Sequence, residues 1–197
     1  MKRKGLLISV SIAVSVAVVS AIAVSASHGV SAAPKASATQ DKYTLKVENG
    51  LAFSEFRGYE SWPVIAISHN GDMLAVTVGN PAMIDAYKAG FPGNGKPAPD
   101  GAKMAKVHWN AKKADEPGTP WVPGTQHDVD FMVKDSKRFA DSGGWGWGEF
   151  EYDAASGTFR PGNMTDKPPQ RNDAKCGLAC HTAVQDKDYV FTEYGSR

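Results

Sequence analysis

The chain lacks an excess of either charge. Its 197 residues include 22 Lys and Arg against 21 Asp and Glu, a formal net charge of +1, and the charges are interspersed rather than gathered into one block. A binding face for nucleic acid or for an anionic membrane surface needs a basic block of that kind. The composition therefore predicts no nucleic-acid partner and favours small molecules or other proteins.

Cysteine is also scarce, because the chain has only Cys176 and Cys180. In an exported protein two cysteines usually form a disulfide. Here His181 follows the second cysteine directly, and two thiols followed by a histidine are typical of the C-x-x-C-H attachment site of a c-type haem. Three residues separate these cysteines, one more than in that signature. A thioredoxin-like pair would need a βαβ setting, and a zinc site would need a second pair of ligands.

Methionine is missing after this motif. Only 16 residues follow His181, and none of them is Met. A small helical electron carrier has its motif near its start and a Met ligand downstream, and a four-helix cytochrome needs four long amphipathic segments, which this chain lacks. The sequence thus predicts one covalent haem c of another architecture, with Cys176 and Cys180 as its thioether residues and His181 as the iron ligand.

The N-terminus predicts export. Residues 1–4 are Met followed by three basic residues, residues 6–26 carry no charge, and residues 30–32 offer small side chains before a cleavage point. We expect a signal peptide at residues 1–32, although the uncharged run is also long enough for an uncleaved membrane anchor. Either alternative places the protein in the periplasm. Residues 33–50 are predicted to be a flexible leader, and residues 51–197 a single domain.

The domain is predicted to be α+β, an antiparallel β-sheet with a few short helices and a C-terminal haem-attachment segment. Asn70-Gly71 is a strong hairpin signal, and Asn80-Pro81 is typical of a helix start. Asp135 can cap another short helix. Strands are expected at 63–68, 73–78, 104–109, 128–133 and 145–152, helices at 80–90 and 135–139, and Gly/Pro loops at 91–101 and 117–124.

The ordered set of motifs resembles the cytochrome P-460 family, which includes the cytochrome c′-β proteins. The resemblance covers about residues 53–194 and is carried by the following anchors: Asp100-Gly101, Lys106, Val133-Lys134-Asp135-Ser136 with Arg138-Phe139, the haem motif, and Val190-Phe191-Thr192. It implies a β-rich domain with a single haem near the C-terminus, ligated by His181 and open on the other side. It also implies a homodimer.

Lys106 matches the lysine that is bonded covalently to the haem ring in true P-460 members. The alternation of residues 104–109 puts Lys106 on one face of its strand with Met104 and His108. The alternative is an ordinary exposed strand lysine, and Lys103 is the fallback for the bond.

Asp130 aligns with a distal-pocket carboxylate, which is a glutamate in hydroxylamine-oxidising relatives. A buried carboxylate of this kind can accept protons from a substrate, whereas the alternative is a sheet-edge Asp paired with Lys or Arg. His108 and His127 are candidate distal ligands or proton shuttles, or else structural residues. Trp145 and Trp147 are expected in the core or in a pocket wall.

Three functions are compatible with these residues. The first is an oxidoreductase that converts hydroxylamine to nitrous oxide or nitric oxide and passes electrons to a partner such as another cytochrome, with Asp130 and Lys106 in its catalytic site. The second is a non-enzymatic nitric-oxide-binding protein like cytochrome c′-β, which lacks the lysine bond. The third is an electron-transfer cytochrome, which would need a sixth ligand such as Met104, Met132 or His127.

Overall fold

The computed structural model describes residues 40–114, 117–118 and 120–196. The predicted export segment, residues 1–32, and the first part of the leader lie outside these residues. Among the described residues no helix has the length and apolar character needed to cross a bilayer.

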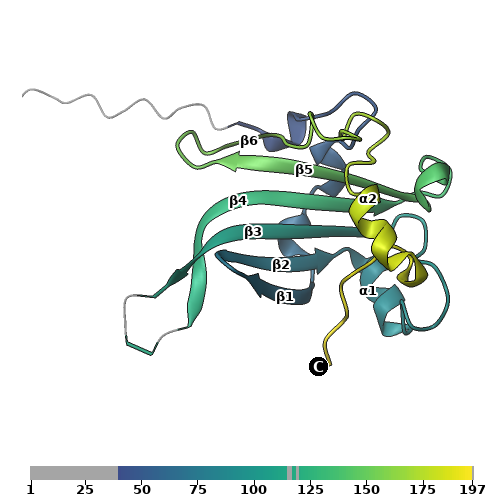
Figure 1. Ribbon diagram of the computed structural model, residues 1–197, viewed down its shortest axis with the longest axis horizontal. Coiled ribbons are helices and arrows are strands. Elements are labelled where there is room, and N and C mark those ends of the chain that lie inside the picture. Colours follow the sequence, from purple (N-terminus) through teal and green to yellow (C-terminus); the bar gives the residue numbers. More distant parts are fainter. Residues whose placement is uncertain (1–39, 115–116, 119, 197) are drawn as a thin grey trace, which may run out of the picture. The chain divides into compact units, whose positions relative to one another are not determined.

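Six strands of the described residues form one antiparallel sheet in which each strand pairs with its neighbour in sequence (Figure 1). The strands are β1 (Val64–Asn70), β2 (Met73–Gly79), β3 (Lys103–Lys113), β4 (Trp121–Lys134), β5 (Trp145–Asp153) and β6 (Thr158–Pro161). The predicted antiparallel α+β fold is confirmed, and the Asn70-Gly71 turn joins β1 to β2 as expected.

The helices are short. They are α1 (Pro81–Lys88), α2 (Leu178–His181) and the 3-10 helices η1 (Lys42–Thr44), η2 (Phe53–Phe56), η3 (Tyr59–Ser61), η4 (Ala140–Ser142) and η5 (Thr182–Lys187). Helix α1 begins as predicted, because the Asn80 side chain accepts a hydrogen bond from the Met83 amide at 3.1 Å and Pro81 occupies the first turn.

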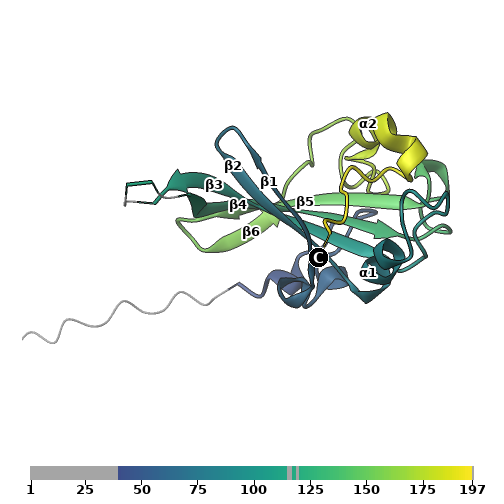
Figure 2. The same ribbon diagram turned by 90° about the horizontal axis from the view of Figure 1, so that it is seen from below.

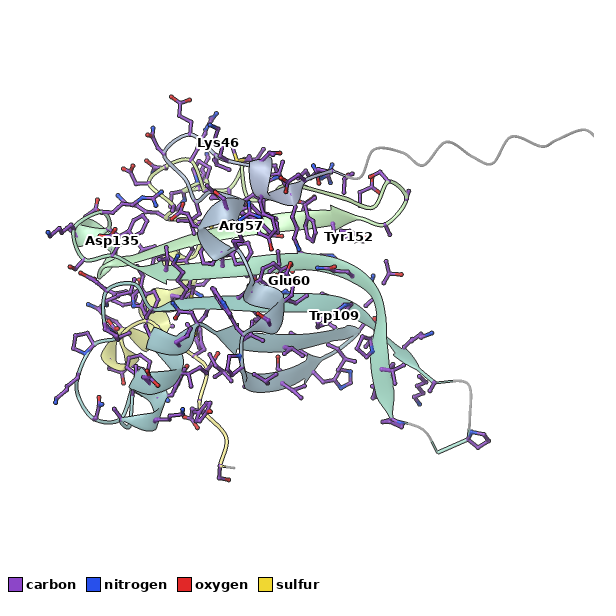
Figure 3. All side chains as sticks on the ribbon, turned by 180° about the vertical axis from the view of Figure 1, so that it is seen from behind. Lys46, Arg57, Glu60, Trp109, Asp135 and Tyr152 are labelled. Carbon is purple, nitrogen blue, oxygen red and sulfur yellow. The ribbon has the colours of Figure 1, made fainter. Side chains whose placement is uncertain are left out.

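The two faces of the sheet carry different layers. Helices η1–η3 lie on one face, and α2 lies on the other (Figure 2). Figure 3 views the first face, with Arg57 and Glu60 labelled above the strands. Beneath these helices Phe56 stacks on Phe131 at 4.0 Å, and Phe53 meets Phe150 edge-on at 4.8 Å. This phenylalanine cluster is the larger part of the core and fixes the sheet from one side.

The structured domain begins before residue 51. Residues 42–44 form η1, Val47 is buried, and Lys46 makes a β-bridge with Ala52. Tyr43 and Leu45 pack against the phenylalanine cluster. The prediction of a flexible leader is therefore wrong for residues 40–50, since apolar side chains within this stretch find partners on the domain.

Two further predictions were wrong. The loop expected at 117–124 is partly strand, because β4 starts at Trp121 and pairs there with β3. Pro123 is tolerated because β5 pairs with β4 only from Asp128 onward, which leaves that edge of β4 open.

The helix expected after Asp135 is a turn, in which the Asp135 carboxylate accepts from the amides of Lys137 and Arg138.

Candidate functional site

A cavity of about 400 Å³ opens on the sheet face opposite the phenylalanine cluster. This size lies within the range of small-molecule and cofactor sites. Strands β3, β4 and β5 supply its floor, and the segment from Asn163 to Thr192 supplies its other walls. Its lining includes Met104, Lys106, Asp130, Trp147, Cys176, Cys180 and His181.

His181 is held in one orientation by its neighbours. Its Nδ1 donates to the backbone carbonyl of Tyr189 at 2.6 Å, so Nε2 carries the free lone pair. The rings of Trp147 and Phe191 flank it at 5.4 and 5.0 Å between centroids. Burial lowers the pKa of His181 and so favours the neutral imidazole. A neutral histidine fixed by a backbone carbonyl is the usual form of a metal ligand.

Cys176 and Cys180 are both free thiols that line the same cavity as His181. The additional residue between them is accommodated by a turn at Cys176 and Gly177, after which α2 begins at Leu178. The segment is tied to β5, because the Trp147 amide donates to the carbonyl of Ala174. The longer spacing therefore still brings both sulfurs and the imidazole to one cavity.

These residues fit a haem. Two thiols can add to its vinyl groups, and one imidazole nitrogen is free to ligate its iron. Met104, Met132 and Trp147 supply buried apolar wall. Phe191 is 52% exposed beside His181, which leaves an aromatic surface for a planar apolar group to cover.

The polar floor of the cavity is formed by Lys106 and Asp130. They lie directly opposite each other in the β3–β4 pairing, and Glu149 follows opposite Asp130 on β5. Burial and the nearby charge of Asp128 raise the pKa of Asp130 to about 6. Burial and the charges of Asp130 and Asp128 raise the pKa of Glu149 to about 7. Both carboxyl groups therefore titrate near neutral pH.

A second polar group adjoins this floor. Asp128 is buried and accepts from both His108 Nδ1 at 2.5 Å and His127 Nδ1 at 2.6 Å. Burial alone would raise the pKa of Asp128, but these hydrogen bonds and the histidine charges outweigh it and lower the pKa. His108 Nδ1 also lies 3.7 Å from Asp130.

The family model described as Cytochrome P460 matches residues 56–192. The chain belongs to the cytochrome P460 family. No curated protein matches the chain. Membership in the P460 family implies a haem cofactor, and the cavity that contains both cysteines and His181 is the part of this P460 domain that can hold it.

The structure brings together most of the predicted site of this P460 domain. Lys106, Asp130, Cys176, Cys180 and His181 all line the cavity. Met104, Met132 and Trp147 lie in its wall, and Trp145 is fully buried in the core.

Other predicted residues of the P460 domain lie elsewhere. Lys103 is on the opposite face, where its ammonium donates to the carbonyl of Glu55, so it cannot replace Lys106. His108 and His127 are outside the cavity lining and contact Asp128 instead.

Asp128 and Glu149 also line the cavity, although neither was predicted as a site residue. Residues of equal parity lie on one face of a strand. The alternation along this strand already put Asp128 on the same face as Asp130, which is the cavity side of β4, and this was the signal for Asp128 as a site residue.

Proposed function

We propose that this chain is an exported, periplasmic mono-haem c-type cytochrome that oxidises hydroxylamine to nitrous oxide or nitric oxide. Cys176 and Cys180 hold the haem through thioether bonds, His181 Nε2 ligates its iron, and Lys106 Nζ bonds to the ring. When bound, the haem supplies an open coordination position for a small nitrogen compound and takes up its electrons, which a partner cytochrome receives.

The observation that carries this proposal is that Lys106 and Asp130 lie opposite each other on neighbouring strands and both line the cavity. Oxidation of hydroxylamine releases protons together with electrons, so the site needs a base beside the substrate. A base works best when its pKa is near the working pH. The Asp130 pKa of about 6 meets this condition, because the carboxylate is mostly ionised at neutral pH and still returns its proton readily.

The apolar wall of the cavity favours a second candidate function. Met104, Met132 and Trp147 surround the site with buried apolar surface, which suits an uncharged diatomic ligand. A protein that binds nitric oxide without turnover would use this wall and would not need Asp130.

The test is hydroxylamine turnover by the purified holoprotein with a dye as electron acceptor. We expect wild-type protein to reduce the dye and Asp130→Asn to do so about 10²- to 10⁴-fold more slowly, the usual contribution of a positioned base. Asp85→Asn, on the exposed surface of α1, is the matched control and should keep full activity. Wild-type protein that binds nitric oxide but shows no turnover would support the second candidate.

A further inference from the structure

The strongest feature outside the haem-binding residues is the group formed by His108, Asp128 and Asp130. One nitrogen or oxygen atom of each side chain lies within 4.8 Å of the others. Asp128 is buried, and its side chain and that of His108 are only 9% and 15% exposed. We call these three residues the β3–β4 triad.

The donor atoms suit a transition metal. Imidazole nitrogen and carboxylate oxygen are ordinary zinc ligands, with bonds of about 2.1 Å, so ligand atoms around a tetrahedral zinc ion lie roughly 3.4 Å apart. His108 Nδ1 lies 2.5 Å from Asp128 Oδ1 and 3.7 Å from Asp130 Oδ2. These separations bracket the required value, and small side-chain rotations would open the shorter one.

The backbone holds the triad in place. His108 and Asp128 are direct partners in the β3–β4 pairing, and Asp130 is the next residue of β4 on the same face. The register shifts between His108 and Trp109, which leaves His127 as an extra residue on β4. From this bulge His127 Nδ1 contacts Asp128 Oδ2, while the other carboxylate oxygen, Oδ1, contacts His108 Nδ1. A hydrogen bond from a second histidine to the oxygen that does not bind the metal, here Asp128 Oδ2, is the type of contact that orients a metal-binding carboxylate.

Carboxylates outnumber the Lys and Arg side chains around the triad. Glu149 and Glu151 lie opposite Asp130 and Asp128 on β5, so four carboxylates share this part of the sheet. Arg160 pairs with Glu151 at the exposed edge, and Lys106 is the cation opposite Asp130. A divalent cation beside Asp128 and Asp130 would offset the repulsion between them.

We propose that His108, Asp128 and Asp130 bind one divalent transition-metal ion of the zinc type, with water completing its coordination. The site is separate from the haem ligands and does not depend on hydroxylamine chemistry. Because Asp130 belongs to both sites, a bound ion would compete with protons for its carboxylate.

The test is calorimetric titration of the holoprotein with ZnCl₂ after removal of metals by chelator, without hydroxylamine. Any free thiols are alkylated first, so that Cys176 and Cys180 cannot bind zinc. We expect one zinc ion per chain. His108→Ala and Asp130→Asn should each abolish this binding, and His127→Ala should weaken it about 10- to 100-fold.

His69→Ala is the matched control, because His69 lies beside Trp121 and is not part of the triad, and it should bind zinc like wild type. Circular dichroism establishes that each variant is folded, and Asp130→Asn preserves the shape of the side chain if His108→Ala does not fold. No saturable binding by wild type, or equal binding by wild type and a folded triad variant, would overturn the proposal.

Discussion

Lys134 and Asp188 form a buried ion pair that fixes the chain beside His181. Lys134 Nζ lies 2.7 Å from Asp188 Oδ1 and donates also to the carbonyl of Gly143, while Asp188 Oδ2 accepts from the amide of Ala98. Asp188 and Tyr189 both have left-handed backbone conformations, with φ of 52° and 63°. Such conformations need support from the surrounding structure. The ion pair supplies it at Asp188, directly before Tyr189, whose carbonyl orients His181.

Replacing Lys134 with Met should destabilise the protein strongly. The side chains of Lys134 and Asp188 are only 6% and 15% exposed, so the variant leaves a buried carboxylate without its cation. Loss of one partner of such a pair costs about 3–5 kcal/mol. Urea unfolding measures this change. Arg160→Met breaks the exposed pair with Glu151 and should cost less than about 1 kcal/mol; equal losses in the two variants would contradict the role of burial.

The cysteines should carry the haem despite their longer spacing. Mass spectrometry of denatured wild-type protein should give the mass of the polypeptide plus one haem. The double variant Cys176→Ser, Cys180→Ser should release its haem on denaturation, and each single variant should keep one thioether bond. A wild-type polypeptide free of haem after denaturation would show that attachment is not covalent.

Removal of the imidazole should change the iron ligation. His181→Ala leaves the Tyr189 carbonyl without its donor and the cavity without the free Nε2. We expect an altered haem absorption spectrum in this variant. His69→Ala changes a histidine that is not part of the cavity lining, and it should keep the wild-type spectrum. An unchanged spectrum in His181→Ala would assign the ligand to another residue.

A bond between Lys106 and the haem ring should be visible in the dithionite-reduced protein. We expect wild type to show a strongly red-shifted Soret band and Lys106→Met to show an ordinary ferrous c-type spectrum. Lys103→Met is the control, since Lys103 lies on the opposite face of β3. An ordinary spectrum in wild type would show that Lys106 is not bonded to the haem and would favour the gas-binding candidate.

Stability should fall as the pH rises through neutrality. The pKa of Glu149 is raised from 4.5 to about 7 in the folded protein, so the folded state binds this proton more tightly than the unfolded state. The resulting stabilisation is complete below pH 4.5 and is lost as the pH rises through about 7. Urea unfolding of Glu149→Gln should show a weaker decline between these values than wild type. Asp153→Asn, at the end of β5, is the control and should leave the decline unchanged; an identical slope in Glu149→Gln would contradict the assignment.

Local signals in the sequence predicted much of the fold. Asn80 caps α1 as expected because its side chain satisfies an amide of the first turn, which depends only on neighbouring residues. Lys106 and Asp130 point to one cavity because alternation along a strand fixes the face of each side chain. The motif at residues 176–181 likewise identified three cavity residues from adjacent positions alone.

Interactions between distant segments could not be predicted in this way. The contact of His108 with Asp128 depends on the register of β3 against β4, and that of His127 depends on a bulge, neither of which has a signal in the local sequence. The pair of Lys134 with Asp188 joins residues 54 positions apart. Residues 40–50 lack a strong periodic pattern. They are ordered because Tyr43 and Leu45 pack against the phenylalanine cluster, whose residues lie far away in the sequence.

Side chains along β3 and β4 alternate between the core and the cavity, so neighbouring residues have different roles. Ala105, Val129 and Val133 belong to the core that holds the sheet, whereas their immediate neighbours Lys106, Asp130 and Met132 line the cavity. A substitution at one of these neighbours can alter the ligand or the chemistry without removing a side chain from the phenylalanine cluster. The same scaffold can therefore acquire new reactivity by changes at alternate positions while its folding determinants stay as they are.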